Sequence, residues 1–216
     1  MTSTDPFSGD LHPSYKDRVF HERRWWDTGI ELVAGLDEVG RGCLAGPVVA
    51  AAVILPRGAG FEEARDSKTL SPRRRLALDR IIRAQALAVS IAWSGPEEID
   101  RMNILNASLK AMAMAVDNLP VRPGTLLIDG NQQIPHPLPQ ETLIKGDLRS
   151  VSISCASIVA KVYRDQLMER MHELYPHYKF HRNKGYGTTE HRRALKRHGF
   201  CPIHRKTFRG VRELVG

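Results

Sequence analysis

The sequence predicts an α/β protein: a mixed five-stranded sheet flanked by helices, with a small helical cap at the C-terminus. Three observations predict this class. Short apolar blocks of strand length recur along the chain. Longer segments with helical spacing lie between and after them, and from residue 176 onward basic residues interleave with aromatic ones. With 216 residues, 42% of them hydrophobic, the chain is long enough for one sizeable domain with an appendage.

Five apolar blocks give the predicted strands, namely residues 30–36, 48–55, 86–94, 125–129 and 141–145. About ten residues join the first two blocks, and the third follows a helical segment, so this part of the sheet can be antiparallel. The fourth block comes only after a long helical crossover, which is typical of parallel pairing. We therefore expect a mixed sheet.

Capping residues and periodicity predict the helices. Ser71 is placed as the N-cap of a helix that begins at Pro72 and runs through RRRLALDRIIRAQA. A second helix is expected to begin at Pro96 and to run through MNILNASLKAMAMAVDNL. The third, SCASIVAKVYRDQLMERMHELYP, has apolar residues at helical spacing, namely Ile158, Val162, Leu167, Met171 and Leu174.

Three segments are expected along the chain. Residues 1–30 are predicted to be an N-terminal extension, partly disordered, in which YKDRVFHERRWWDTG forms a short helix. Trp25 and Trp26 are expected to pack on the core, the alternative being that they bind bases. Residues 31–175 form the main domain and residues 176–216 the basic helical cap.

Charge and cysteine usage indicate the partner and the compartment. A net charge of +8 and a pI near 9.7 favour a polyanionic partner such as nucleic acid. The N-terminus lacks the apolar core of a secretory signal, and the longest apolar run, VVAAAVIL, is too short for a membrane span, so a cytosolic protein is expected. Cys43, Cys155 and Cys201 show no CxxC spacing, which favours buried reduced thiols over disulfides or a zinc ribbon.

Acidic residues follow three of the predicted strands: Asp37 and Glu38, then Asp129, then Asp147. If these strands run in one direction, their carboxyl ends share one edge of the sheet and the four carboxylates meet in one cleft. Such a cluster repels itself unless cations neutralise it, and oxygen ligands suit Mg²⁺ or Mn²⁺. Each acid can alternatively belong to an ordinary turn at a strand end.

A glycine-rich turn follows the first two acids. Adjacent residues of a strand point to opposite faces, so Asp37 and Glu38 can serve one cluster only if the backbone leaves the pleat there. Gly40 and Gly42 permit this, and they let the backbone approach a hydroxyl or phosphate closely. A dinucleotide-binding loop is excluded, because the spacing is GxGxxxG and Pro47 leads directly into a strand.

Eight segments carry a resemblance to a known family. In order, they are GLDEVGRG (35–42), DSKTL (66–70), NILNAS (103–108), LIDGN (127–131), KGD (145–147), SISCASIVAKVYRD (152–165), KGYGT (184–188) and HRKTF (204–208). On these eight segments taken together, the chain resembles the type 2 ribonuclease H family, ribonuclease HII, from residue 33 to residue 208. The bulky Leu148 and Arg149 after KGD depart from the family's common pattern.

The resemblance implies a ribonuclease H-like mixed five-stranded sheet and a site. It implies that the four acids, Asp37, Glu38, Asp129 and Asp147, bind two ions of Mg²⁺ or Mn²⁺. It implies that the Gly40-Arg41-Gly42 backbone reads a ribose 2′-hydroxyl and that Tyr186 lies against the sugar at the RNA to DNA step. Lys68, Lys161 and, in the segment HRNKGYG, Lys184 are expected near phosphates.

The implied reaction is two-metal hydrolysis of the phosphodiester 5′ of a ribonucleotide, in RNA/DNA hybrids or embedded in duplex DNA, leaving 5′-phosphate and 3′-hydroxyl ends. The implied partner is that nucleic acid, with no membrane contact and a monomeric protein. The rival is a non-catalytic basic nucleic-acid-binding protein. Three smaller alternatives stay open: Arg41 pairs with a neighbouring acid, Tyr186 pins the cap to the core, and the arginines of 72–85 form a solvated face. The nine histidines are expected at the surface or near phosphates.

Overall fold

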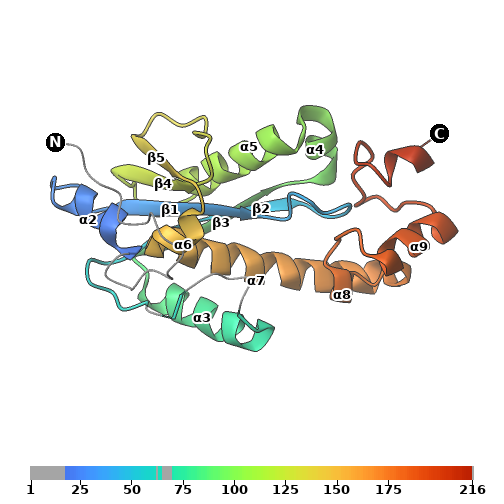
Figure 1. Ribbon diagram of the computed structural model, residues 1–216, viewed down its shortest axis with the longest axis horizontal. Helices are drawn as coiled ribbons and strands as arrows, with labels where there is room; N and C mark the ends of the chain where they lie inside the picture. Colours follow the sequence, from blue (N-terminus) through green and yellow to red (C-terminus); the bar gives the residue numbers. More distant parts are fainter. Residues whose placement is uncertain (1–17, 62, 65–69, 216) are drawn as a thin grey trace.

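The computed structural model describes residues 18–61, 63–64 and 70–215 (Figure 1). The first part of the predicted extension and Lys68 of DSKTL lie outside the described residues. The elements are α2 (Phe20–Trp26), β1 (Val33–Val39), β2 (Val48–Ile54), α3 (Pro72–Gln85), β3 (Ala88–Ser94), α4 (Pro96–Met102), α5 (Ile104–Asp117), β4 (Thr125–Asp129), β5 (Gln140–Leu143), α6 (Gly146–Arg149), α7 (Val151–Leu174), η1 (Pro176–Tyr178), α8 (Phe180–Asn183), α9 (Thr189–His198) and η2 (Arg212–Leu214).

The strands form one mixed sheet with β1 at its centre. In the described residues the sheet has five strands, in the order β3-β2-β1-β4-β5 (Figure 1). β2 pairs antiparallel with β1 and with β3, whereas β4 pairs parallel with β1 and with β5. The predicted mixed pairing is confirmed, because the antiparallel strands follow short connections and β4 follows the long crossover through α4 and α5.

Helices cover both faces of the sheet. α5 lies against one face, and α7 with α3 lies against the other (Figure 1). Leu36 and Ile128 belong to the core on the α5 side, whereas Val49 and Ala51 belong to the core on the α7 and α3 side. Because β2 is buried on both faces, its sequence VVAAAVI is apolar throughout.

The long helix α7 crosses β1 at very short range. A Cβ on Gly35 would collide with the α7 backbone at Ser152 and Ile153. Ser150 caps α7 by accepting the Ile153 N–H at 3.2 Å. The buried Glu22 of α2 accepts the Ser152 N–H at 2.9 Å. The N-terminal helix therefore fixes the end of α7 that lies beside the centre of the sheet.

Two helix predictions have different outcomes. Ser71 caps α3 as predicted, since its hydroxyl accepts the Arg74 N–H at 3.3 Å. The single helix predicted from Pro96 is wrong, because Asn103 adopts φ +69° and divides it into α4 and α5. The Asn103 side chain accepts the Asn106 N–H at 3.0 Å and so caps the second helix. An asparagine tolerates the positive φ and supplies the cap at the same point.

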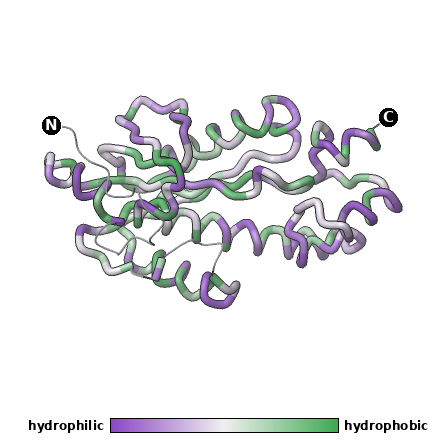
Figure 2. Tube along the Cα trace, in the orientation of Figure 1, coloured by the Kyte–Doolittle hydropathy of each residue, from purple (hydrophilic) through white to green (hydrophobic). Residues whose placement is uncertain are grey.

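The residues after α7 pack around a separate apolar cluster. Tyr178, Phe180 and Leu195 form it together with Leu44 from the loop after β1 and Met168 from α7. Two distant parts of the chain thus contribute to the core of the C-terminal segment. Figure 2 shows hydrophilic stretches over α9, at the end of the molecule that carries the C-terminus.

The two tryptophans and the cysteines lie as expected. Trp26 is buried and Trp25 packs beside it, as expected of core residues. All three cysteines lie within the described residues and are free and buried. None of the helices in the described part of the chain is long and apolar enough to cross a membrane.

Candidate active site

Asp37 and Asp129 lie side by side at one edge of the sheet. The parallel register places Leu36 opposite Ile128, so the next residue of each strand is the acid. Asp37 is buried and accepts a hydrogen bond from Ser157 of α7, which places it on the α7 face. Burial raises the pKa of Asp37 well above its usual range, and the neighbouring carboxylates raise it further against the Ser157 hydrogen bond.

Glu38 points to the opposite face of the sheet from Asp37. β1 keeps regular register with β2, with Glu38 opposite Ala50 and Val39 as the last paired residue. The backbone therefore does not leave the pleat at the two acids, because pairing with β2 holds them both in the strand. Burial raises the pKa of Glu38, while the Arg41 guanidinium, which donates to Glu38 Oε1 at 3.2 Å, lowers it.

Asp147 reaches the same edge through a turn. The predicted fifth strand is too long, since β5 ends at Leu143 and Asp147 lies in the short helix α6. The Gly146 N–H donates to Asp129 Oδ1 at 2.6 Å and so ties this turn to the end of β4. Asp147 is buried, and its charge contributes to the raised pKa of Asp37.

The four acids offer a donor set made only of carboxylate oxygens. Such a set suits a hard divalent cation, and a cation relieves the repulsion that raises the pKa of Asp37. Across residues 18–61, 63–64 and 70–215, no three His, Cys, Asp or Glu side chains are arranged as a preformed metal site. The residues fit a divalent cation by donor chemistry, and Glu38 lies close enough to Asp37 and Asp129 that its charge raises the pKa of Asp37 and the charge of Asp129 raises the pKa of Glu38.

The turn Gly40-Arg41-Gly42 follows β1 directly. Gly40 has φ +96°, and a Cβ there would collide with the Arg164 side chain, so backbone and packing both require glycine. A Cβ on Gly42 would meet no described atom within 4 Å, which leaves that side of the turn open. The Arg41 side chain is half exposed and pairs with Glu38, as in the alternative that pairs it with a neighbouring acid.

Tyr186 lies beside this turn. Its backbone forms an antiparallel bridge with Cys43, the residue after Gly42. Its N–H donates to the Asn183 carbonyl at 2.8 Å, whereas the residue as a whole is 41% exposed. Burial of the remainder raises the pKa of the Tyr186 hydroxyl. The backbone of Tyr186 pins the C-terminal segment to the turn, and the ring is left accessible next to it.

The predicted lysines are paired with acids of α7. Lys161 Nζ lies 2.7 Å from Asp165 Oδ1, and Lys184 Nζ lies 2.6 Å from Glu169 Oε1. Lys68 lies outside the described residues. A phosphate that approaches Lys161 or Lys184 therefore competes with a carboxylate already in contact.

The prediction that the histidines lie at the surface or near phosphates is wrong for three of them. His21, His191 and His204 are buried. His21 Nδ1 lies 2.8 Å from Glu141 Oε1, and the other two face each other in the C-terminal segment. Buried imidazoles need hydrogen-bond partners, and among the described residues only the partner of His21 comes from a distant part of the sequence.

Two buried arginines beside the turn were not predicted. Arg164 and Arg205 are among the largest fully buried side chains in the described residues. Arg164 lies on the same stripe of α7 as Ser157 and Met168, so a charged residue on a buried helical stripe was an available signal. Arg205 lies in HRKTF, which has no periodicity to mark it. Their contacts shape the loop after β1.

Comparison with known proteins identifies the family. A family model described as Ribonuclease HII matches residues 34–211. The Ribonuclease HII of Syntrophus aciditrophicus (strain SB) is 52% identical over 188 residues, covering 87% of this chain and 89% of the relative. The Ribonuclease HII of Chlamydia abortus (strain DSM 27085 / S26/3) is 48% identical over 201 residues, covering 93% and 92%.

Solved structures share the fold. The ribonuclease H2 of Pyrococcus horikoshii OT3 superposes with a TM-score of 0.70 at 25% identity, covering 85% of this chain and 96% of that one. The RNase HII in the PCNA:RNase HII complex from Archaeoglobus fulgidus superposes with a TM-score of 0.70 at 26% identity, covering 82% of this chain and 95% of that one. Bst-RNase HIII in complex with Mn²⁺ superposes with a TM-score of 0.67 at 18% identity, covering 85% of this chain and 68% of that one. This match is a likeness of fold alone.

These matches agree with the architecture described above. The mixed sheet with α5 on one face and α7 on the other is the ribonuclease H-like fold predicted from the sequence. The family model covers the sheet, both covering helices and most of the C-terminal segment. The chain therefore belongs to the ribonuclease HII family of nucleases.

Proposed function

We propose that this chain is a metal-dependent endoribonuclease that hydrolyses the phosphodiester 5′ of a ribonucleotide. The substrate is an RNA/DNA hybrid or a single ribonucleotide in duplex DNA, and the products carry 5′-phosphate and 3′-hydroxyl ends. The family supports the reaction class. The observation that carries the finer proposal is that Asp37, Asp129 and Asp147 share the edge of the sheet from which the 40–42 turn leaves.

The proposal assigns metal binding to four carboxylates, Asp37, Glu38, Asp129 and Asp147. They would hold Mg²⁺ or Mn²⁺, two ions per site, and Mn²⁺ is the ion bound by the structural neighbour Bst-RNase HIII. When bound, such ions activate the attacking water and stabilise the leaving oxygen. Ser157 orients the Asp37 carboxylate, and the Gly146 N–H orients that of Asp129.

Recognition of the ribose is assigned to the backbone of Gly40, Arg41 and Gly42 together with Tyr186. Cleavage that does not depend on base sequence requires the enzyme to recognise the sugar, and the 2′-hydroxyl is the group that distinguishes RNA from DNA. The open side of Gly42 leaves room for a sugar, and the accessible ring of Tyr186 lies beside it. An aromatic ring with a hydroxyl can pack on a sugar and still donate a hydrogen bond.

Affinity is assigned to basic side chains that neutralise phosphates without reading sequence. α9 carries exposed cations, namely Arg192, Arg193, Lys196 and Arg197, and Lys68, Lys161 and Lys184 are proposed to join them. Arg73, Arg74 and Arg80 of α3 are exposed, which supports a solvated face for that helix. We also propose a monomer that acts in the cytosol, and the three free cysteines support a reducing compartment.

The rival function is nucleic-acid binding without catalysis, and one assay separates the two. A duplex with a single ribonucleotide is incubated with Mg²⁺ or Mn²⁺, then with chelator, and the product ends are mapped. We expect a nick 5′ of the ribonucleotide that chelator abolishes. Asp129→Asn should lose cleavage and retain binding, whereas Asp117→Asn, an exposed acid on α5, should cleave normally. Binding without a metal-dependent nick in the wild type would establish the rival.

A further inference from the structure

Arg205 is a fully buried cation whose donors reach the loop after β1. Its Nε donates to the Gly46 carbonyl at 3.0 Å, Nη1 to the Arg41 carbonyl at 2.8 Å and Nη2 to the Gly40 carbonyl at 2.7 Å. Its guanidinium carbon lies 5.0 Å from the centre of the Phe208 ring. Burial lowers the pKa of Arg205 to about 10, which leaves it charged at neutral pH.

The hydrogen bonds of Arg205 orient two amides of the turn. In a trans peptide the carbonyl and the following N–H point in opposite directions. Because the carbonyls of Gly40 and Arg41 point at Arg205, the N–H groups of Arg41 and Gly42 point away from it. Neither N–H donates a backbone hydrogen bond to another described residue, and the space beside Gly42 is open. The turn therefore presents two unused donors on its open side.

Arg164 donates to a different set of carbonyls, two in the same loop and one in the C-terminal segment. Its Nε donates to the Pro47 carbonyl at 3.0 Å, Nη2 to the Ala45 carbonyl at 3.1 Å and Nη1 to the Lys184 carbonyl at 2.8 Å. Both arginines are fully buried, and each donates to three backbone carbonyls. Of the two arginines, only Arg205 donates to carbonyls of the 40–42 turn, so Arg164 serves as its matched control.

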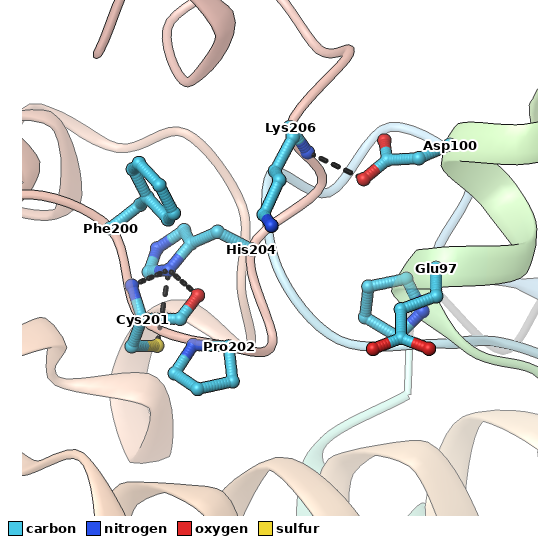
Figure 3. A pocket seen from close by; sticks show the side chains of 8 residues that line it. Glu97, Asp100, Phe200, Cys201, Pro202, His204 and Lys206 are labelled. Atoms are coloured by element: carbon cyan, nitrogen blue, oxygen red, sulfur yellow. Dashed lines mark hydrogen bonds between the residues drawn. The ribbon is translucent and has the colours of Figure 1, made fainter. Parts of the chain in front are cut away.

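The segment that carries Arg205 is anchored on both sides. Its N–H donates to the Leu44 carbonyl at 2.9 Å. Asp100 of α4 accepts the N–H groups of Lys206 and Thr207 at 2.8 and 2.9 Å. Figure 3 shows Asp100 turned toward Lys206. Glu97 of the same helix lines the cavity between α4 and the C-terminal segment. Asp100 thus holds the two residues that follow Arg205.

We propose that Arg205 is a positioning residue for ribose recognition, which orients the Arg41 and Gly42 amides toward the 2′-hydroxyl. This inference rests on the proposed function of the turn. Arg205 itself touches no substrate, since its donors are used by the loop. A hydroxyl oxygen accepts from such amides, and a deoxyribose offers no oxygen at that point. Arg205 therefore controls how strongly the turn prefers ribose over deoxyribose.

The test compares Arg205→Lys with Arg164→Lys. Affinities for a duplex with one ribonucleotide and for the matching all-DNA duplex are measured in chelator, and Tm, KM and kcat are measured alongside. A lysine ammonium cannot reach three carbonyls, so we expect Arg205→Lys to lose about tenfold in ribose preference and to raise KM more than it lowers kcat. Arg164→Lys should lower Tm about as much as Arg205→Lys does, but its preference for the ribonucleotide duplex should stay within about threefold of the wild-type value.

Two results would overturn the inference: an unchanged ribose preference in Arg205→Lys, or an equal loss in both variants. If Arg205→Lys does not fold, Asp100→Ala takes its place, with Glu97→Ala as its control. Asp100→Ala should reduce the preference about threefold and Glu97→Ala should not, and equal behaviour of these two would refute the inference. A wild type without ribose preference or cleavage would refute the proposed function instead, so the two failures are distinguishable.

Discussion

His191 and His204 meet through their Nε2 atoms, which lie 3.0 Å apart in the C-terminal segment. His191 Nδ1 lies 2.8 Å from the Tyr186 carbonyl, so this nitrogen carries a hydrogen and donates. His191 Nε2 is then an acceptor and His204 Nε2 the donor. His204 Nδ1 accepts the Cys201 N–H at 3.0 Å (Figure 3). A chain of neutral rings thus links Cys201 to the backbone of Tyr186.

Protonation of His204 should break this chain. Burial lowers the pKa of His204 from 6.5 to about 4. Between these pH values the unfolded chain binds a proton at His204 that the folded chain does not bind. Stability contributed by the neutral ring is complete above pH 6.5 and is lost as pH falls toward 4, by at most roughly 3 kcal/mol. Denaturant unfolding between these pH values measures the loss. His204→Asn should flatten the slope, whereas His177→Asn, at an exposed site, should leave it unchanged.

Gly35 sets the distance between α7 and β1. Gly35→Ala should lower the free energy of unfolding by about 3 kcal/mol, because the new methyl group meets the rigid backbone of Ser152 and Ile153. Gly60→Ala is the control, since a Cβ there meets no described atom within 4 Å, and it should change stability by less than about 0.5 kcal/mol. Equal values for the two variants in urea unfolding would contradict the close approach.

Glu22 should contribute to stability through the first turn of α7. Its Oε1 accepts the Ser150 and Ser152 hydroxyls, both at 2.6 Å, and the Ser152 N–H at 2.9 Å. Glu22→Gln replaces a charged acceptor by a neutral one at a helix N-terminus and should destabilise the protein by about 2 kcal/mol. Glu31→Gln, at an exposed position, should have little effect in the same unfolding measurement.

Features encoded by neighbouring residues were predictable. The cap at Ser71 was predicted correctly because the cap and the first helical turn adjoin in sequence. The strand Thr125–Asp129 matches its predicted bounds, since it is a continuous apolar run that ends in Asp-Gly. The acid after each of two strands, together with the long crossover between them, allowed Asp37 and Asp129 to be expected at one edge of the sheet if the strands ran in one direction, and the register shows that they do.

Features set by distant partners were not predictable. Glu38 stays in β1 because β2 pairs as far as Val39, and pairing partners cannot be read from the strand alone. Arg205 donates to the Gly40 carbonyl, 165 residues earlier in the chain, so no local pattern reveals its role. Asn103 breaks the predicted helix through a single positive φ, which periodicity does not report.

The half-exposed side chain of Arg41 allows a test of which part of the turn reads the sugar. If the backbone reads it, Arg41→Met should keep the ribose preference within about threefold, since the carbonyls of Gly40 and residue 41 still accept from Arg205. The same variant removes the guanidinium that lowers the pKa of Glu38, so overall cleavage should fall. Competition between ribonucleotide and all-DNA duplexes measures the preference. A loss of preference as large as that from Arg205→Lys would assign the reading to the side chain.

The ring of Tyr186 is proposed to act at the RNA to DNA junction. Because the residue is 41% exposed while its backbone is held by Asn183 and His191, Tyr186→Ala should remove sugar packing without unfolding the segment. We expect about a tenfold loss of discrimination between a junction and a uniform hybrid, with total binding changed by less than about threefold. Tyr186→Phe keeps the ring and removes the hydroxyl, so it separates packing from hydrogen bonding. Cleavage of the two substrates in parallel, with Tm as a check on folding, measures the effect, and equal losses on both substrates would exclude a junction-specific role.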